Sequence, residues 1–91
     1  VDIFLADLDR RLVELRLQVG AERLDVVRGV AHSLKGSSGN LGAFRLSHYC
    51  GTMEHQARAG DLAAVAAGLD DLGREADRVR EFFLAERQAS A

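Results

Sequence analysis

His32 and Lys35 are the two side chains whose types and spacing could do chemistry together. They are three residues apart, which places them one turn apart on the same side of a helix. A neutral imidazole is a competent nucleophile near pH 7, and a lysine ammonium suits a phosphoryl oxygen as a point charge. Lys35 is the only lysine among the 12 basic residues, the others all being arginine. The pair therefore predicts phosphoryl transfer through the imidazole.

Three glycines surround this histidine and leave its side of the helix almost bare. Gly29, Gly36 and Gly39 stand at i−3, i+4 and i+7 from His32. Each glycine inside a helix costs about 0.5–1 kcal/mol relative to alanine, so the chain gives up stability here. His32 points about 140–160° away from the apolar face centred on Leu34, and we expect it to face solvent. We call this side of the helix, formed by the three glycines on either side of His32, the bare stripe. We interpret it as a surface on which a partner can approach the imidazole closely.

Four segments with helical spacing of apolar residues must position these groups. The spacing predicts helices over roughly residues 2–19, 22–40, 43–59 and 61–87. Gly20 and Gly60 are the expected stops after the first and third helices, and Asp61 is the expected N-cap of the fourth. Because the links are short, neighbouring helices must run antiparallel. The sequence thus predicts an all-α protein, an antiparallel up-down-up-down four-helix bundle forming a single domain over residues 1–91.

Two of the predicted helices have apolar faces that reach the ends of their segments. In the first helix we expect this face to begin at Val1, and in the second helix we expect it to extend to Leu41.

Composition excludes several other classes of protein. There are no prolines and only five aromatic residues, which argues against a β-sandwich or barrel. A net charge of −2 gives no field to hold a nucleic acid. A single cysteine, Cys50, can form neither an internal disulfide nor a zinc site of several thiolates. No segment predicts a membrane span or a signal peptide, so we expect the cytoplasm, and the start at Val1 suggests a piece of a longer protein.

The residues that carry this chemistry form a run that resembles the signature of histidine-containing phosphotransfer (HPt) domains. The run His32-Ser-Leu-Lys-Gly-Ser-Ser-Gly-Asn-Leu-Gly-Ala43 is similar to the family pattern of H-x-L-K-G, small residues and then L-G. The next segment is also similar to the family, through residues that include Leu46, Met53, Glu54 and the Gly60-Asp61 turn. The resemblance covers nearly the whole chain and is weakest in the first helix.

The resemblance implies a monomeric four-helix bundle that carries phosphate on His32 and exchanges it with an aspartate of a response-regulator receiver domain. Lys35 would stabilise the phosphoryl group, and Gly36 would leave room for it. Glu54 would hydrogen-bond the imidazole, although a solvated surface role for Glu54 remains open. The domain itself would need no cofactor and no metal, because magnesium would be supplied by the receiver. An upstream histidine kinase, or the receiver of a hybrid kinase, would be the other partner.

Several alternatives remain open at this point. The chain could be the N-terminal phosphotransfer domain of a chemotaxis-type histidine kinase, or a helical adaptor whose histidine has no chemistry. The dimerisation and phosphoacceptor domain of a sensor kinase fits less well, because it follows its histidine with an acidic residue and then a proline, whereas Ser33 follows here. Since no segment resembles a nucleotide-binding loop, we expect a phosphocarrier rather than a self-sufficient enzyme. It would either stand alone or belong to a larger, membrane-bound kinase.

Overall fold

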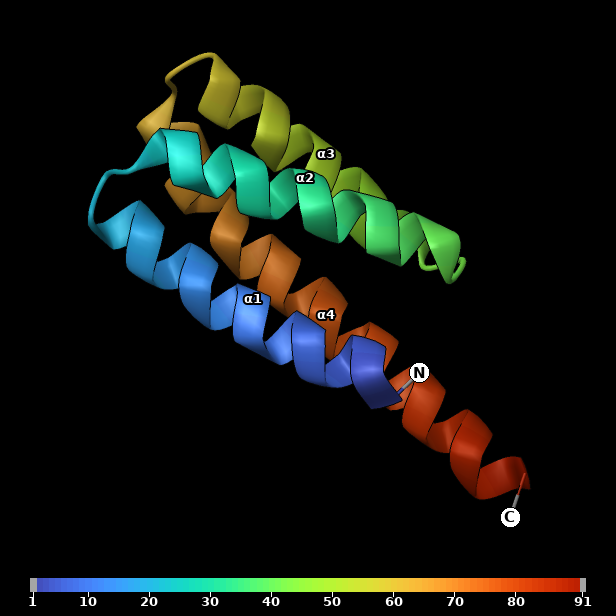
Figure 1. The fold of residues 1–91 in the computed structure, drawn as a ribbon. Helices are drawn as coiled ribbons and strands as arrows, with labels where there is room; N and C mark the ends of the chain where they lie inside the picture. The colour runs from blue at the N-terminus through green and yellow to red at the C-terminus, as the bar shows by residue number, and fades with distance from the viewer. Residues whose placement is uncertain (1, 91) are drawn as a thin grey trace.

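The computed structural model describes residues 2–90 and consists of four α-helices (Figure 1). These are α1 (Asp2–Gly20), α2 (Leu24–Asn40), α3 (Phe44–Arg58) and α4 (Leu62–Ser90). Each helix packs against the next one in the chain, and α1 also packs against α4, so the helices enclose one core. The predicted all-α four-helix bundle is confirmed. Val1, where the first apolar period was expected to begin, lies outside the described residues.

The core is built from the apolar face of each helix. Leu8 and Leu15 of α1, Leu34 of α2, Leu46 of α3 and Leu72 of α4 are all 0% exposed. Burial of a side chain of this size stabilises the fold by about 1.5–3 kcal/mol, so these residues fix how each helix is rotated about its axis. For α2 this rotation turns the opposite face, which contains His32, toward solvent.

Leu41 is not part of this core, and its prediction was wrong. It is 40% exposed, and α2 ends one residue before it, at Asn40. The period of an α-helix places side chains on one face only while the helix continues. After Asn40 the chain turns through Gly42, which has a φ of 80°, and the helical spacing no longer predicts where Leu41 points.

The end of α1 also differs from the prediction. Gly20 is the last residue of the helix, and the left-handed residue that follows is Glu22, with a φ of 58°. The N–H of Glu22 donates to the carbonyl of Val19 at 3.0 Å, and the N–H of Arg23 donates to that of Gln18 at 2.9 Å. This pair of bonds is the Schellman arrangement. It occupies the residues expected to begin the second helix, so α2 starts at Leu24 instead of residue 22.

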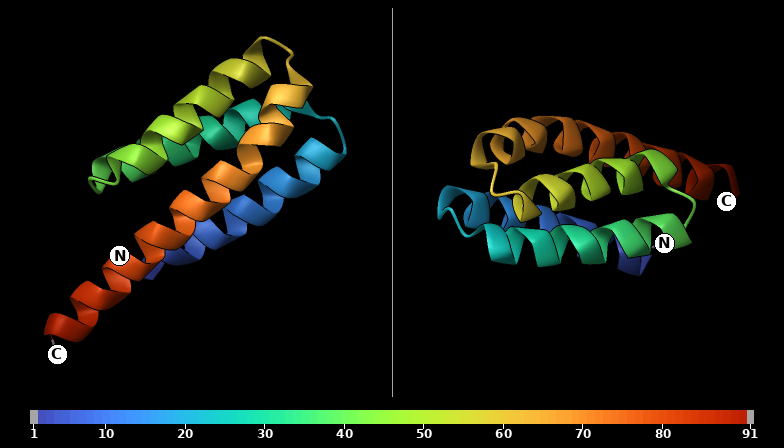
Figure 2. Two further views of the ribbon diagram at one scale, coloured as in Figure 1. Left: turned by 180° about the vertical axis from the view of Figure 1, so that it is seen from behind. Right: turned by 90° about the horizontal axis from the view of Figure 1, so that it is seen from above.

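The junction between α3 and α4 follows the prediction closely. Gly60 adopts a φ of 76° after α3, and the side chain of Asp61 accepts a hydrogen bond from the N–H of Ala64 at 3.1 Å. The predicted stop and N-cap are both confirmed. The fourth helix continues to Ser90, beyond the predicted residue 87, and its C-terminal part projects past the other helices (Figure 2). No helix of residues 2–90 combines the length and the apolar character that a membrane span requires.

Candidate functional site

Glu54 lies at the centre of a group of four polar side chains on α2 and α3. One carboxylate oxygen, Oε2, is 2.9 Å from Nδ1 of His32, and the other, Oε1, is 2.8 Å from Nζ of Lys35. Arg58, one turn further along α3, reaches Oε2 with its guanidinium at 3.3 Å. The Glu54 side chain is 8% exposed, whereas the His32 side chain is 67% exposed. The site therefore consists of an accessible imidazole that is hydrogen-bonded to a buried carboxylate.

The charge of this anion is maintained by its neighbours. The hydrogen bond from Lys35 lowers the pKa of Glu54, and the bond with His32 adds to this effect, while burial acts in the opposite direction. The net result is a pKa below the ordinary value of 4.5, so Glu54 is a carboxylate near pH 7. An ionised carboxylate only accepts hydrogen bonds, so Nδ1 of His32 carries the proton and donates the hydrogen bond to Oε2 of Glu54. A solvated surface role for Glu54, left open by the sequence, does not apply.

The outer face of α2 around His32 is open. At Gly29 and Gly36, an added Cβ would meet no atom within 4 Å in the described part of the chain, apart from the helix's own backbone and the chain neighbours. At Gly39, it would make an ordinary contact of 3.5 Å with Oγ of Ser47. Close helix packing therefore does not explain Gly29 or Gly36, and the stripe on either side of His32 is free for a partner.

Two residues of α3 fix the position of Lys35. The hydroxyl of Ser47 donates to the backbone carbonyl of Lys35 at 2.9 Å, which ties α3 to α2 beside the site. The stem of Lys35 crosses α3 at Gly51, where an added Cβ would lie 3.2 Å from Cδ of the lysine. The absence of a side chain at Gly51 lets the ammonium reach Glu54. The roles of Ser47, Gly51 and Arg58 were not predicted from the sequence, because only the contact between the helices gives them a role.

Two comparisons with known proteins found similar proteins. The sequence model of the Hpt domain matches residues 1–82. The chain belongs to the Hpt domain family. A crystal structure of histidine-containing phosphotransfer protein B from Pseudomonas aeruginosa is similar to it, with a TM-score of 0.93 and 39% sequence identity over 97% of this chain and 76% of that one. No curated protein sequence matches the chain.

Family membership gives this Hpt domain its general role. It is a histidine phosphotransfer carrier of a phosphorelay, the kind of system in which kinases and receiver domains are the partners. The chemotaxis-kinase and adaptor alternatives are not favoured by these matches.

The other candidate nucleophiles of the Hpt domain lie apart from Glu54. His48 and His55 are exposed on α3, and the structure gives neither of them a carboxylate partner within residues 2–90. Cys50 is fully buried, and burial raises the pKa of its thiol to about 12, so it stays protonated. Among the described residues, no three metal-binding side chains gather closely enough to hold a metal ion.

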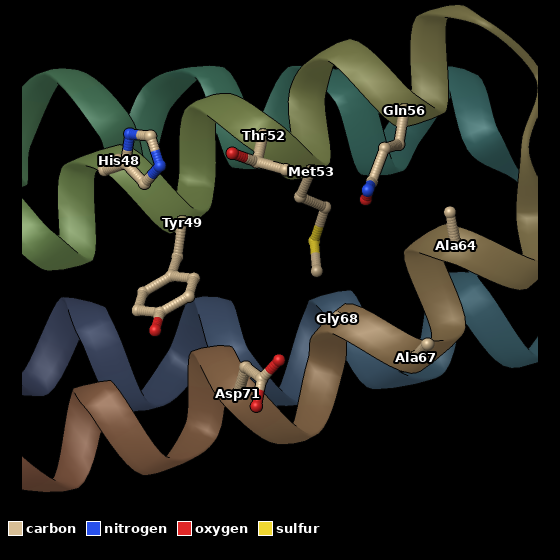
Figure 3. Close-up of a pocket in the computed structure, with 9 residues that line it drawn as sticks. All are labelled: His48, Tyr49, Thr52, Met53, Gln56, Ala64, Ala67, Gly68 and Asp71. Atoms are coloured by element: carbon tan, nitrogen blue, oxygen red, sulfur yellow. The ribbon is translucent and has the colours of Figure 1, made fainter.

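A separate hollow of the Hpt domain opens between α3 and α4 (Figure 3). On α4 it is lined by the small residues Ala64, Ala67 and Gly68, and Met53 of α3 points toward it. His48 is the only histidine in its lining. The hollow lies on the side of α3 turned away from Glu54, and His32 does not contribute to it. It therefore has no direct connection with the site.

Proposed function

We propose that Nε2 of His32 accepts and donates the phosphoryl group. The observation that carries this proposal is the hydrogen bond from Nδ1 of His32 to Glu54. With the proton held on Nδ1, the lone pair is on Nε2, which is the nitrogen not engaged by Glu54. The buried carboxylate also holds the ring in one orientation and stabilises the positive charge that the imidazole acquires when it attacks phosphorus.

The transfer exchanges one bond to phosphorus for another. Nε2 forms a bond to phosphorus, while the bond to the carboxylate oxygen of the receiver's aspartyl phosphate breaks and that oxygen leaves with the electron pair. The reverse reaction returns the group to an aspartate. Such a transfer requires the entering and leaving atoms in line with phosphorus, so the partner must approach His32 closely. Open space at Gly36 permits this approach.

Lys35 is the proposed counterion of the phosphoryl group. Its ammonium forms an ion pair with Glu54, next to the imidazole, and its side chain is 40% exposed. An ammonium on a flexible stem can move from the carboxylate to a phosphoryl oxygen with a small rearrangement. Gly36 and Gly39 extend the docking surface on the C-terminal side of His32, and Gly29 extends it on the other side.

The remaining parts of the proposal concern the partners. The receiver domain supplies the aspartate and the magnesium ion, and this domain supplies no cofactor of its own. We propose that this domain acts as a monomer, because the receiver needs access to one exposed face of α2. We also propose that it acts in the cytoplasm. An upstream histidine kinase, or the receiver of a hybrid kinase, provides the phosphoryl group.

A transfer experiment tests the assignment of His32. The domain is mixed with a panel of radiolabelled, phosphorylated receivers, and label on the domain is followed together with its stability to acid and base. Acid-labile, base-stable label is expected on the wild type and on a His48→Gln/His55→Gln control. His32→Gln should take up none. Acid-labile label on His32→Gln would place the phosphoryl group on another histidine.

A further inference from the structure

A hollow opens next to His32 on the opposite side from Lys35. Its volume is about 280 Å³, and it is lined by Arg28, Gly29, His32, Glu54 and Arg58. Lys35 does not line it, nor do Gly36 and Gly39. The space beside the imidazole therefore lies over the turn of α2 that precedes His32, rather than over the turn that follows it.

The geometry of a helix explains why the imidazole borders this hollow. Side chains on an α-helix lean toward its N-terminus, so the ring of His32 lies over the preceding turn. Gly29 occupies that turn at i−3, and its missing side chain leaves the space open. Arg28 stands at i−4, where Cβ atoms are about 5–6 Å apart, so its long side chain can reach a group attached to the ring.

The hollow has more positive than negative charge. It contains two guanidinium groups and one carboxylate, and both oxygens of that carboxylate already accept bonds from His32 and Lys35. Arg58 reaches Glu54 only at 3.3 Å. The side chain of Arg28 has no hydrogen bond or ion pair to any residue between 2 and 90. A phosphoryl group carries a charge of about −1.5 to −2 near pH 7 and presents three acceptor oxygens, so it would supply the anion that this hollow lacks.

We propose that Arg28, together with Arg58, binds the oxygens of the phosphoryl group on Nε2 of His32, across the imidazole from Lys35. The inference rests on the proposed function and extends it with a second cationic contact. Gly29 provides the space for the phosphoryl group itself, while Gly36 provides access for the partner. Guanidinium groups suit this role because their N–H groups can donate two parallel bonds to phosphoryl oxygens.

Phosphorus NMR of the isolated domain provides the test. The protein is phosphorylated with phosphoramidate, which transfers its phosphoryl group to the imidazole and releases ammonia, and the ³¹P shift is followed against pH. The ³¹P shift follows the protonation of the phosphorylated imidazole ring, and each guanidinium nearby disfavours the protonated, positively charged ring. Arg28→Gln and Arg58→Gln are therefore each expected to raise the pKa of the phosphohistidine by about 0.5, and the double variant by about 1. The control, Arg10→Gln/Arg74→Gln, removes the same charge from exposed pairs on α1 and α4 and should leave this pKa unchanged.

The outcomes separate this inference from the proposed function. A ³¹P signal that is absent from the wild type, or that persists in His32→Gln, would contradict the assignment of His32. A signal that depends on His32 but titrates alike in the wild type, the arginine variants and the control would overturn the inference and leave the function standing. If the arginine variants slow transfer to a receiver without changing the titration, the arginines act on the partner, and the inference is also wrong.

Discussion

Glycines in two regions of this molecule do different work. On the outer face of α2, a Cβ at Gly29 or Gly36 would meet nothing within 4 Å outside its own helix, within the described structure. On the facing surfaces of the bundle, an added Cβ would lie 3.2 Å from Lys35 at Gly51 and 3.0 Å from Arg16 at Gly73. The second pair makes room for side chains of other helices, whereas no side chain of the described residues fills the space at the first pair.

The comparison shows that α2 can lose helix stability at positions where missing side chains leave His32 accessible. Glycine in a helix interior costs about 0.5–1 kcal/mol, and at Gly36 no close contact with another helix of residues 2–90 offsets this cost. At Gly51 the missing side chain allows the contact between Lys35 and Glu54, at 2.8 Å, to form. One region thus keeps the histidine accessible, and the other sets the charges beneath it.

Gly36→Gln should have the largest effect on transfer. The glutamine side chain would extend into the open space one turn beyond His32 and stand in the way of a receiver. Misplacement of about 1 Å can slow a positioned reaction by on the order of 100-fold, and a loss of this order is expected. Because glutamine is a better helix former, the free energy of unfolding should rise or stay the same. Transfer kinetics and thermal unfolding measure the two effects.

Ala66→Gln is the matched control, since Ala66 is exposed on α4, away from the site. It should transfer at the wild-type rate. If Gly36→Gln unfolded the domain, Gly36 would be a packing residue after all. If it transferred normally, the open stripe would not be the docking surface.

Lys35→Ala should have the next largest effect. Removal of the ammonium leaves the phosphoryl group without its proposed counterion, and a decrease in transfer rate of about 10-fold is expected, in line with the loss of one charge-assisted contact. Unfolding should become easier by less than about 1 kcal/mol, because the side chain is 40% exposed. Rapid-quench transfer and urea titration provide the measurements. An unchanged transfer rate would remove Lys35 from the site.

Gly51→Ala should slow phosphoryl transfer for the same reason as Lys35→Ala, but by a smaller factor. The new methyl group would lie 3.2 Å from Cδ of Lys35, so the flexible stem must move by a few tenths of an ångström. Transfer should slow by about two- to threefold, while the gain in helix propensity raises stability by up to about 1 kcal/mol. In a Lys35→Ala background, the same change should leave the transfer rate unaltered. A second decrease there would show that Gly51 acts by another route.

Glu54→Gln should alter the response to acid. The folded-state pKa of Glu54 is lowered, so its ionised form stabilises the fold above the unfolded-state pKa, and this contribution is lost as the pH falls through the lower, folded-state value. The variant lacks this contribution at neutral pH. The difference in urea midpoint between wild type and variant should therefore be largest near pH 7 and shrink below about pH 4.5. A difference that stays constant across this range would show that the charge of Glu54 does not stabilise the fold.

Much of the fold was predictable because each helix has its own period. Buried residues such as Leu34 fix the rotation of α2, and that rotation turns His32 outward whatever the other helices do. Helix boundaries were less predictable, since Glu22 adopts a left-handed φ that its residue type does not favour. The prediction that Leu41 belongs to the apolar face of α2 was wrong for a related reason, because the helical spacing of apolar residues applies only while the helix continues.

The sequence by itself determined that His32 is exposed and which face of α2 is bare, because both follow from the 3.6-residue repeat within one helix. The tertiary structure decided what lies beneath that histidine. Glu54 is 22 residues from His32 in the chain, and their contact depends on how far α3 slides along α2. That register is set by packing and by bonds such as the one from Ser47 to Lys35, which no repeat within a single helix specifies. Arg28 and Arg58 come to line one hollow for the same reason.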